Sequence, residues 1–275
     1  MRSSEPLART GGKDRPLALA DRLYRLCKQT GQRLRSRPVD RRRVFVAGVQ
    51  RSGTNLLMQV LDRAWDTDVY HETDPRAFHR YEMRPQLVIE ALMARSRAPV
   101  FVLKSLCELQ DLGDLMRRHA PARTLWMLRG YEEVTRSMLA SFGNFVRQAH
   151  RLAEDKAGSE WRGRGMSDAT QKILREAVED GLDEASAAAL MWYYRNVLFF
   201  EQGFAGDPGV RLVRYESLLA DPQLECCRIA TFLGLPLSPR AVAAITPRAV
   251  VSGGVEVSPL VRRHCDALMR RFAAL

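Results

Sequence analysis

The chain has 275 residues, of which 46% are hydrophobic, so we expect one sizeable core and no second full domain. Its net charge is +11, but residues 1–43 hold 13 of the 43 Lys and Arg and only 4 of the 32 Asp and Glu, so the basicity is mainly N-terminal. No run of transmembrane length and no signal peptide is evident, and the five cysteines lack metal-ligand spacing. We therefore expect a cytoplasmic protein without a disulfide framework.

Residues 1–42 are predicted to form a basic extension, partly disordered or amphipathic-helical, ahead of a single domain over 43–275. The first sixteen residues favour disorder, and 17–34 predict an amphipathic helix. Its apolar side would gather Leu19, Leu23, Leu26 and Cys27. Such a helix suits peripheral contact with an anionic membrane or an acidic partner, and equally loose packing on the domain. Nucleic acid is not favoured as a partner, because Tyr24 is the only aromatic residue of the extension.

The first strand-turn-helix pattern of the domain contains a glycine-rich loop. An apolar, β-branched run over 44–49 predicts a buried strand, and the apolar spacing from Leu56 predicts a helix. Gly48 and Gly53 have the G-x-x-x-x-G spacing of a phosphate-binding loop. Backbone N–H groups of such a loop, with the N-terminus of the following helix, cradle an anion. The sequence therefore predicts an anion site here.

The loop lacks the residues that metal-assisted phosphoryl transfer uses. Thr54 stands where such loops carry a lysine, and Asn55 where they carry the Ser or Thr that binds magnesium. Arg51 instead offers a planar guanidinium to phosphate-like oxygens. We therefore predict anion binding without a metal.

Further along the chain, short apolar runs predict strands over 99–104, 124–129 and 210–215, separated by helical patterns. Strands that alternate with helices are typical of a parallel sheet covered on both faces. Lys104, at the end of the first of these runs, would converge on the same crevice as the glycine-rich loop.

Two longer helical patterns, over about 131–152 and 183–203, flank a polar break at 157–168. This break predicts either a segment that covers or recognises a substrate, or a plain surface loop. A stretch rich in Gly, Ser and Pro over 246–259 precedes a last basic helix.

The run Arg51-Ser52-Gly53-Thr54-Asn55 resembles the 5′-phosphosulfate loop of sulfotransferases that use 3′-phosphoadenosine 5′-phosphosulfate (PAPS). It matches at four of five positions, with Asn55 in place of a Thr. The resemblance covers about 43–236 and is weakest between 143 and 182. It implies a three-layer α/β/α fold with a central parallel sheet, similar to P-loop nucleoside triphosphate hydrolases, and PAPS as the co-substrate, held by the five loop residues without a metal.

The resemblance also implies contacts to the rest of the nucleotide. Arg129 ends a predicted strand and Ser137 follows eight positions later, the spacing at which family members grip the 3′-phosphate. Gly130-Tyr131 replaces the Asp-Pro or Asn-Pro that usually follows this arginine. A later strand followed by Tyr-Glu implies that Tyr215 lies near the cofactor, although a strand-end tyrosine packed in the core is an equal alternative.

The proton acceptor must differ from that of small-molecule sulfotransferases, because Leu106 occupies the position of their catalytic histidine, two residues after Lys104. Glu72 follows the loop at the spacing of a Glu-Thr pair in tyrosylprotein sulfotransferases, although Asp74 replaces the next arginine. The resemblance implies Glu72 as the general base, although a surface glutamate in a loop is the alternative. His71 and His79, in the same polar stretch, are fallback bases. Arg51 and Lys104 would offset the charge on the leaving phosphate.

We therefore expect a sulfotransferase that moves the sulfuryl group of PAPS in line to a hydroxyl, or less readily an amine, of a small molecule, glycan, lipid or peptide. A divergent P-loop kinase is an alternative that Thr54 and Asn55 disfavour. A non-catalytic anion- or membrane-binding module is another, because one fold supports many functions. The sequence leaves the acceptor and the oligomeric state open.

Overall fold

The structure is a computed structural model that describes residues 19–35, 41–158, 160–248 and 253–275. The disorder predicted for the first sixteen residues concerns a part of the chain outside these ranges. At the centre lies a five-stranded sheet of order β2-β5-β1-β6-β7, in which all neighbours are parallel. Its strands are β1 Arg42–Gly48, β2 Thr67–Tyr70, β5 Val100–Ser105, β6 Ala122–Leu128 and β7 Val210–Arg214. A separate antiparallel hairpin consists of β3 Phe78–His79 and β4 Glu82–Met83.

Alternation along β1 shows why the sheet is covered on both faces. Val44 and Val46 belong to one buried cluster, whereas Phe45 and Ala47 belong to another, and all four are at most 2% exposed. Successive side chains of a strand point to opposite faces, so a continuous apolar run requires helices on both sides. The three-layer α/β/α arrangement with a central parallel sheet is thereby confirmed.

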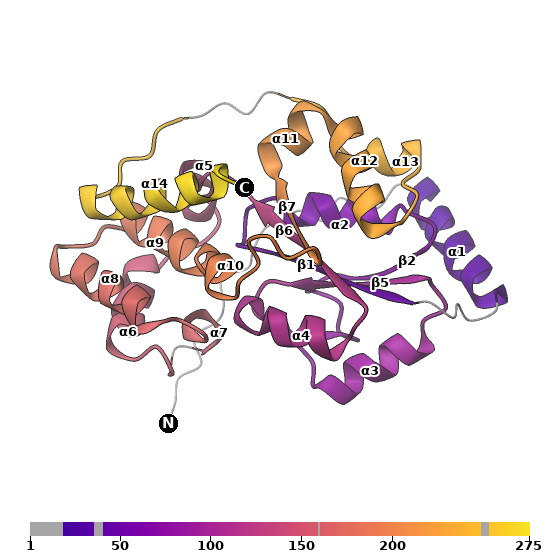
Figure 1. The fold of residues 1–275 in the computed structure, drawn as a ribbon, viewed down its shortest axis with the longest axis horizontal. Helices are drawn as coiled ribbons and strands as arrows, with labels where there is room; N and C mark the ends of the chain where they lie inside the picture. The colour runs from indigo at the N-terminus through magenta and orange to yellow at the C-terminus, as the bar shows by residue number, and fades with distance from the viewer. Residues whose placement is uncertain (1–18, 36–40, 159, 249–252) are drawn as a thin grey trace.

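The helices form these outer layers (Figure 1). One face of the sheet is covered by α2 Thr54–Asp62, α11 Tyr215–Ala220, α12 Pro222–Leu233 and α13 Pro239–Val242. The other is covered by α3 Gln86–Arg95 and α4 Leu112–Arg118, which follows the 3-10 turn Leu109–Asp111. A helical group extends this second layer: α5 Tyr131–Leu139, α6 Phe145–Glu154, α7 Glu160–Gly163, α8 Asp168–Glu179, α9 Glu184–Asn196, α10 Leu198–Glu201 and α14 Pro259–Ala273.

The C-terminal helix α14 is bonded to the start of α5. Tyr131 donates its hydroxyl to Asp266 at 3.0 Å, and Arg262 donates to Glu132 at 3.2 Å. Cys265 and Phe272 of α14 are fully buried in the core cluster of this layer. The position of α5 therefore depends on a helix far along the chain.

The four predicted strands are present, and the sequence missed a fifth. β2 has the sequence Thr-Asp-Val-Tyr and lies at the edge of the sheet, where it pairs with β5. An edge strand this short and polar carries little of the apolar signal that identified the buried strands.

Two predictions for the helical layer were wrong. The single helix expected over 131–152 is two helices, because Asn144 adopts a left-handed conformation (φ 66°) beside Gly143 and turns the chain between α5 and α6. The segment 157–168 is not a plain loop: it contains the short helix α7, whose Trp161 is 8% exposed. Its possible contact with an acceptor stays a prediction.

The predicted N-terminal helix is present as α1 Leu19–Leu34, beside α2 and α13 at one end of the molecule (Figure 1). Its orientation is unexpected, since Lys28 and Gln32 are buried while Leu23 and Leu26 are exposed. None of the described helices has both the length and the apolar character needed to cross a bilayer.

Candidate functional site

The glycine-rich loop joins β1 to α2, and its two glycines are required by close packing. Gly48 and Gly53 have backbone φ angles of 139° and 96°, which residues with a side chain rarely adopt. A Cβ at Gly48 would lie 2.5 Å from the carbonyl oxygen of Met127, and one at Gly53 would lie 2.3 Å from the ring of Tyr215. The loop is thus fixed between β6 and the start of α11.

The side chains of the loop differ in their exposure to solvent. Ser52 and Thr54 are buried, whereas Arg51 and Asn55 are exposed. Arg51 has a positive φ of 71°, a conformation that costs energy in a residue other than glycine. Thr54 and Asn55 begin α2, so the N–H groups of its first turn lie at the loop.

Three predicted nucleotide contacts meet at this loop. Arg51 Nε donates to Ser137 Oγ at 2.8 Å, although 86 residues separate them. Arg129 Nη1 donates to the backbone oxygen of Arg51 at 3.2 Å, and its guanidinium lies 4.5 Å from the centre of the Tyr215 ring. The end of β6, the helix α5 and the loop therefore bring two arginines and a serine hydroxyl together.

Arg248 is a member of this cluster that sequence reasoning missed. It donates to the Tyr215 hydroxyl at 3.1 Å, whereas Gly53 contacts the Cδ2–Cε2 edge of the same ring. Tyr215 is 7% exposed, so its side chain is packed in the core and also lies beside the loop. The stretch after residue 246 offered no motif that singles out Arg248.

A second cluster joins the predicted base to the start of α2. Lys104, at the end of β5, donates to the carboxylate of Glu72 and to the side-chain oxygen of Asn55. Lys104 is 1% exposed, while the Glu72 side chain is 15% exposed and thus keeps access to solvent. Burial lowers the pKa of the Lys104 ammonium, and the Glu72 carboxylate opposes that shift. Glu72, Lys104 and Asn55 therefore form one hydrogen-bonded unit.

The two alternative bases lie in different surroundings. Burial lowers the pKa of His71, with the Lys104 charge acting in the same direction and nearby Asp62 opposing it. His79 is exposed in the β3–β4 hairpin, where its backbone pairs with Glu82. Neither histidine side chain joins the hydrogen-bonded unit of Glu72, Lys104 and Asn55 among the described residues.

Arg195 supports this region from the helical layer and was also missed. This residue of α9 is 1% exposed, and it donates to the backbone oxygens of Leu106 at 3.1 Å and Trp161 at 3.2 Å. It thereby joins the segment after Lys104 to α7. The signal that could have identified Arg195 in the sequence is its place as a single arginine within an aromatic-rich helix.

The residues at the loop fit a phosphate-bearing ligand. Ser52 Oγ and Arg129 Nε are buried polar atoms without a hydrogen-bond partner, and such groups are costly unless a ligand or water satisfies them. Within the described ranges, neither Arg51 nor Arg129 forms an ion pair with a carboxylate. These guanidinium groups and the first turn of α2 present donors suited to anionic oxygens. No group of three or more His, Cys, Asp or Glu suited to holding a metal is found among the described residues.

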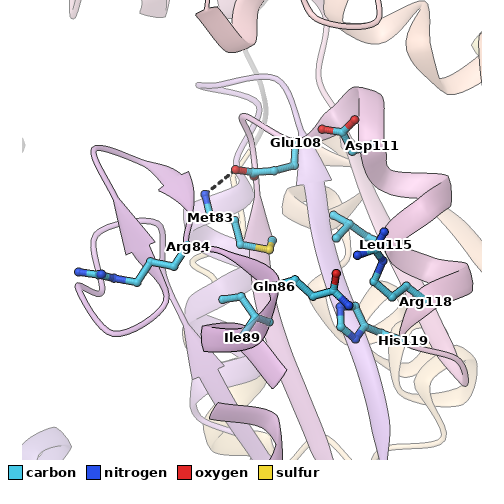
Figure 2. Close-up of a pocket in the computed structure, with 9 residues that line it drawn as sticks. All are labelled: Met83, Arg84, Gln86, Ile89, Glu108, Asp111, Leu115, Arg118 and His119. Atoms are coloured by element: carbon cyan, nitrogen blue, oxygen red, sulfur yellow. Dashed lines mark hydrogen bonds between the residues drawn. The ribbon is translucent and has the colours of Figure 1, made fainter. Parts of the chain in front are cut away.

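A separate pocket of about 160 Å³ lies between α3, α4 and the hairpin (Figure 2). Its lining consists of Met83, Arg84, Gln86, Ile89, Glu108, Asp111, Leu115, Arg118 and His119, none of which was predicted as a site residue. Glu108 accepts from the backbone N–H of Met83 at 2.6 Å, as the dashed line shows. Burial raises the pKa of Glu108 to about 7.

The family model for the sulfotransferase domain matches residues 41–251. The sulfotransferase domain from the curacin biosynthetic pathway is similar in structure, with 14% identity, a TM-score of 0.50, and coverage of 85% of this chain and 99% of that one. A sulfotransferase from Alicyclobacillus acidocaldarius has 17% identity, a TM-score of 0.50, and coverage of 86% and 94%. At such identities the structural likeness concerns the fold alone. No curated protein matches.

Proposed function

The chain belongs to the sulfotransferase domain family, and from this premise we propose that it moves the sulfuryl group of PAPS to an acceptor hydroxyl, or less readily an amine, with Glu72 as the general base. The acceptor belongs to a small molecule, glycan, lipid or peptide. The observation that carries the proposal is the meeting of Arg51, Arg129 and Ser137 at the loop. A ligand with phosphate groups at both its 5′ and 3′ positions needs cations at two neighbouring places, which these residues supply.

The nucleotide is held in three parts. The loop residues Ser52, Gly53, Thr54 and Asn55 cradle the phosphosulfate through backbone N–H groups and the N-terminus of α2. Arg129 and Ser137 bind the 3′-phosphate. Tyr215 lines the same side, supported by its contacts with Gly53 and Arg248.

The reaction requires that the acceptor lose a proton as its oxygen attacks sulfur. Glu72 accepts that proton, a bond forms between the acceptor oxygen and sulfur, and the bond between sulfur and the phosphate oxygen breaks. Arg51 and Lys104 offset the negative charge that develops on the departing phosphate. The hydrogen bond from Lys104 keeps the Glu72 carboxylate in one orientation, which favours an aligned transfer.

The test is calorimetric binding of 3′-phosphoadenosine 5′-phosphate (PAP), the desulfonated product, without magnesium, with AMP and ATP as comparisons. We expect PAP to bind more tightly than AMP, and Arg129→Ala to weaken PAP binding roughly 10- to 100-fold, as expected for a charge-assisted hydrogen bond. Arg123→Ala is the matched control, because Arg123 lies on β6, six residues before Arg129, and its guanidinium lies over the ring of Phe232.

Equal binding of PAP and AMP, or equal effects of the two arginine variants, would contradict the 3′-phosphate site. A preference for ATP that depends on magnesium would favour the kinase alternative. Binding of PAP without any transfer from PAPS across an acceptor panel would favour a non-catalytic module.

A further inference from the structure

The N-terminal helix α1 docks through its polar side. Tyr24, Lys28 and Gln32, spaced four residues apart, donate to backbone oxygens of Arg63, Asp62 and Trp65, each at 2.7 Å. These oxygens lie at and just beyond the end of α2, where the last carbonyls of a helix lack partners within it. Lys28 is 4% exposed and Gln32 is 7% exposed. The polar side of α1 therefore bonds to backbone oxygens at and beyond the end of α2, and this side of the helix faces the domain.

The apolar side of α1 faces away from the domain. Leu23, Leu26 and Leu34 are 54%, 60% and 83% exposed, and Cys27 beside them is exposed too. Side chains three and four positions apart share a helix side, so Leu23, Leu26, Thr30 and Leu34 form one row, which we call the leucine row. A helix that docked to bury apolar area would show the opposite orientation.

Basic side chains border the leucine row. Arg33 is exposed next to Leu34, and two nearby acidic groups are paired with arginines: Asp62 with Arg25, and Asp66 with Arg35. The sequence adds to this charge, since residues 1–43 carry a net +9. An apolar row bordered by positive charge complements a surface that is negative outside and apolar beneath, which describes a bilayer containing anionic lipids.

We propose that the leucine row of α1 binds the surface of a membrane that contains anionic lipids, with the helix lying in the plane of the interface. The leucines enter the boundary between headgroups and acyl chains, and the basic residues remain among the lipid phosphates. Each basic residue near such a surface strengthens binding roughly fivefold, since it contributes about 1 kcal/mol.

This surface is distinct from the anion site. α1 bonds to the C-terminal end of α2, whereas the glycine-rich loop lies at the N-terminal end of the same helix. Figure 1 shows α1 at the end of the molecule away from α5 and α9. Membrane binding is therefore separable from nucleotide binding, and the inference does not rest on the proposed function.

The test is co-sedimentation of the full chain with vesicles of phosphatidylcholine alone and of phosphatidylcholine with phosphatidylglycerol. We expect binding to the anionic vesicles, little binding to the neutral ones, and weaker binding at high salt. Leu34→Glu should weaken binding at least tenfold. Leu87→Glu is the matched control, because Leu87 is 79% exposed on α3 and should leave binding unchanged.

Arg33→Glu is a second variant, which keeps all leucines. It should weaken binding to anionic vesicles and leave the weak binding to neutral vesicles unchanged. The melting temperature and the PAP binding of each variant show whether it is folded, independently of its binding to vesicles. The proposal is overturned if the full chain does not bind anionic vesicles, or if Leu34→Glu and Leu87→Glu change vesicle binding by the same factor. It is also overturned if sedimentation velocity shows a dimer that Leu34→Glu dissociates, because the leucine row would then bind a second copy of the chain.

Discussion

The ring of Tyr215 lies so close to Gly53 that a Cβ at position 53 would stand 2.3 Å from it. Gly53 also has a φ of 96°, so any side chain there meets both strain and collision. The aromatic ring and the turn of the loop thus occupy adjoining space, and each fixes the other.

We expect Gly53→Ala to weaken PAP binding more than tenfold, because Tyr215 must move and the loop with it. Gly181→Ala separates strain from collision, since Gly181 has a φ of 86° but nothing within 4 Å of its would-be Cβ. Both variants should lose about 1–2 kcal/mol of stability through backbone strain, measured by denaturant unfolding. Equal PAP binding by the two would show that Tyr215 does not shape the site.

We expect Glu72→Gln to lower kcat about 10²- to 10⁴-fold, the usual contribution of a general base, while PAP binding stays within about twofold. Glutamine retains an oxygen that accepts from Lys104, so the hydrogen-bonded unit is preserved. The control is Glu82→Gln, which removes a carboxylate paired with Arg164 instead. Full turnover by Glu72→Gln would move the role of base to another group.

We expect Ser137→Ala to weaken PAP binding about 10- to 100-fold, since one hydroxyl hydrogen bond to a charged group is lost. AMP binding should not change, because AMP lacks the 3′-phosphate. Ser141→Ala, in the turn after α5, serves as the matched control. An equal loss for AMP and PAP in calorimetry would mean that Ser137 acts on the loop through Arg51 rather than on the 3′-phosphate.

The contribution of Glu108 to the stability of the protein should fall as pH rises from 5 to 8. Its folded-state pKa is raised to about 7 from 4.5, so the folded state binds the proton more tightly, and the resulting stabilisation is complete below pH 4.5 and lost through pH 7. The loss is at most about 3 kcal/mol. Glu108→Gln should remove this dependence, seen as a melting-temperature gap between variant and parent that widens with pH. Asp114→Asn, exposed on α4, should leave the pH profile as in the parent.

The core of the fold was predictable because the central strands are buried on both faces. Runs such as Val44–Val49 must be apolar throughout, which makes them visible without any structure. The loop was predictable for a related reason, since Gly48 and Gly53 occupy positions that only glycine can fill. The turn at Asn144 was not, because the apolar periodicity continues on both sides of it.

The orientation of α1 could not be deduced from its amphipathic pattern. The pattern identifies the apolar side, but the docked side is the one whose Lys28 and Gln32 bond to the backbone oxygens of Asp62, at the end of α2, and of Trp65, beyond it. Arg248 was hidden for a similar reason: its contact with Tyr215 arises from the tertiary path of the chain and leaves no local signature. The roles assigned to Glu72, Arg129 and Ser137 stay predictions until the variants are measured.

Ser137 stands on α5, and the first turn of α5 is bonded to Asp266 and Arg262 of α14. The glycine-rich loop is made early in synthesis, but α14, to which α5 is bonded, leaves the ribosome much later. The loop itself packs against Met127 and Tyr215, so a nascent chain cannot complete the proposed nucleotide site until these later segments and α14 have been made. We therefore expect tight binding of PAP only from chains in which α14 has been translated and has docked on α5.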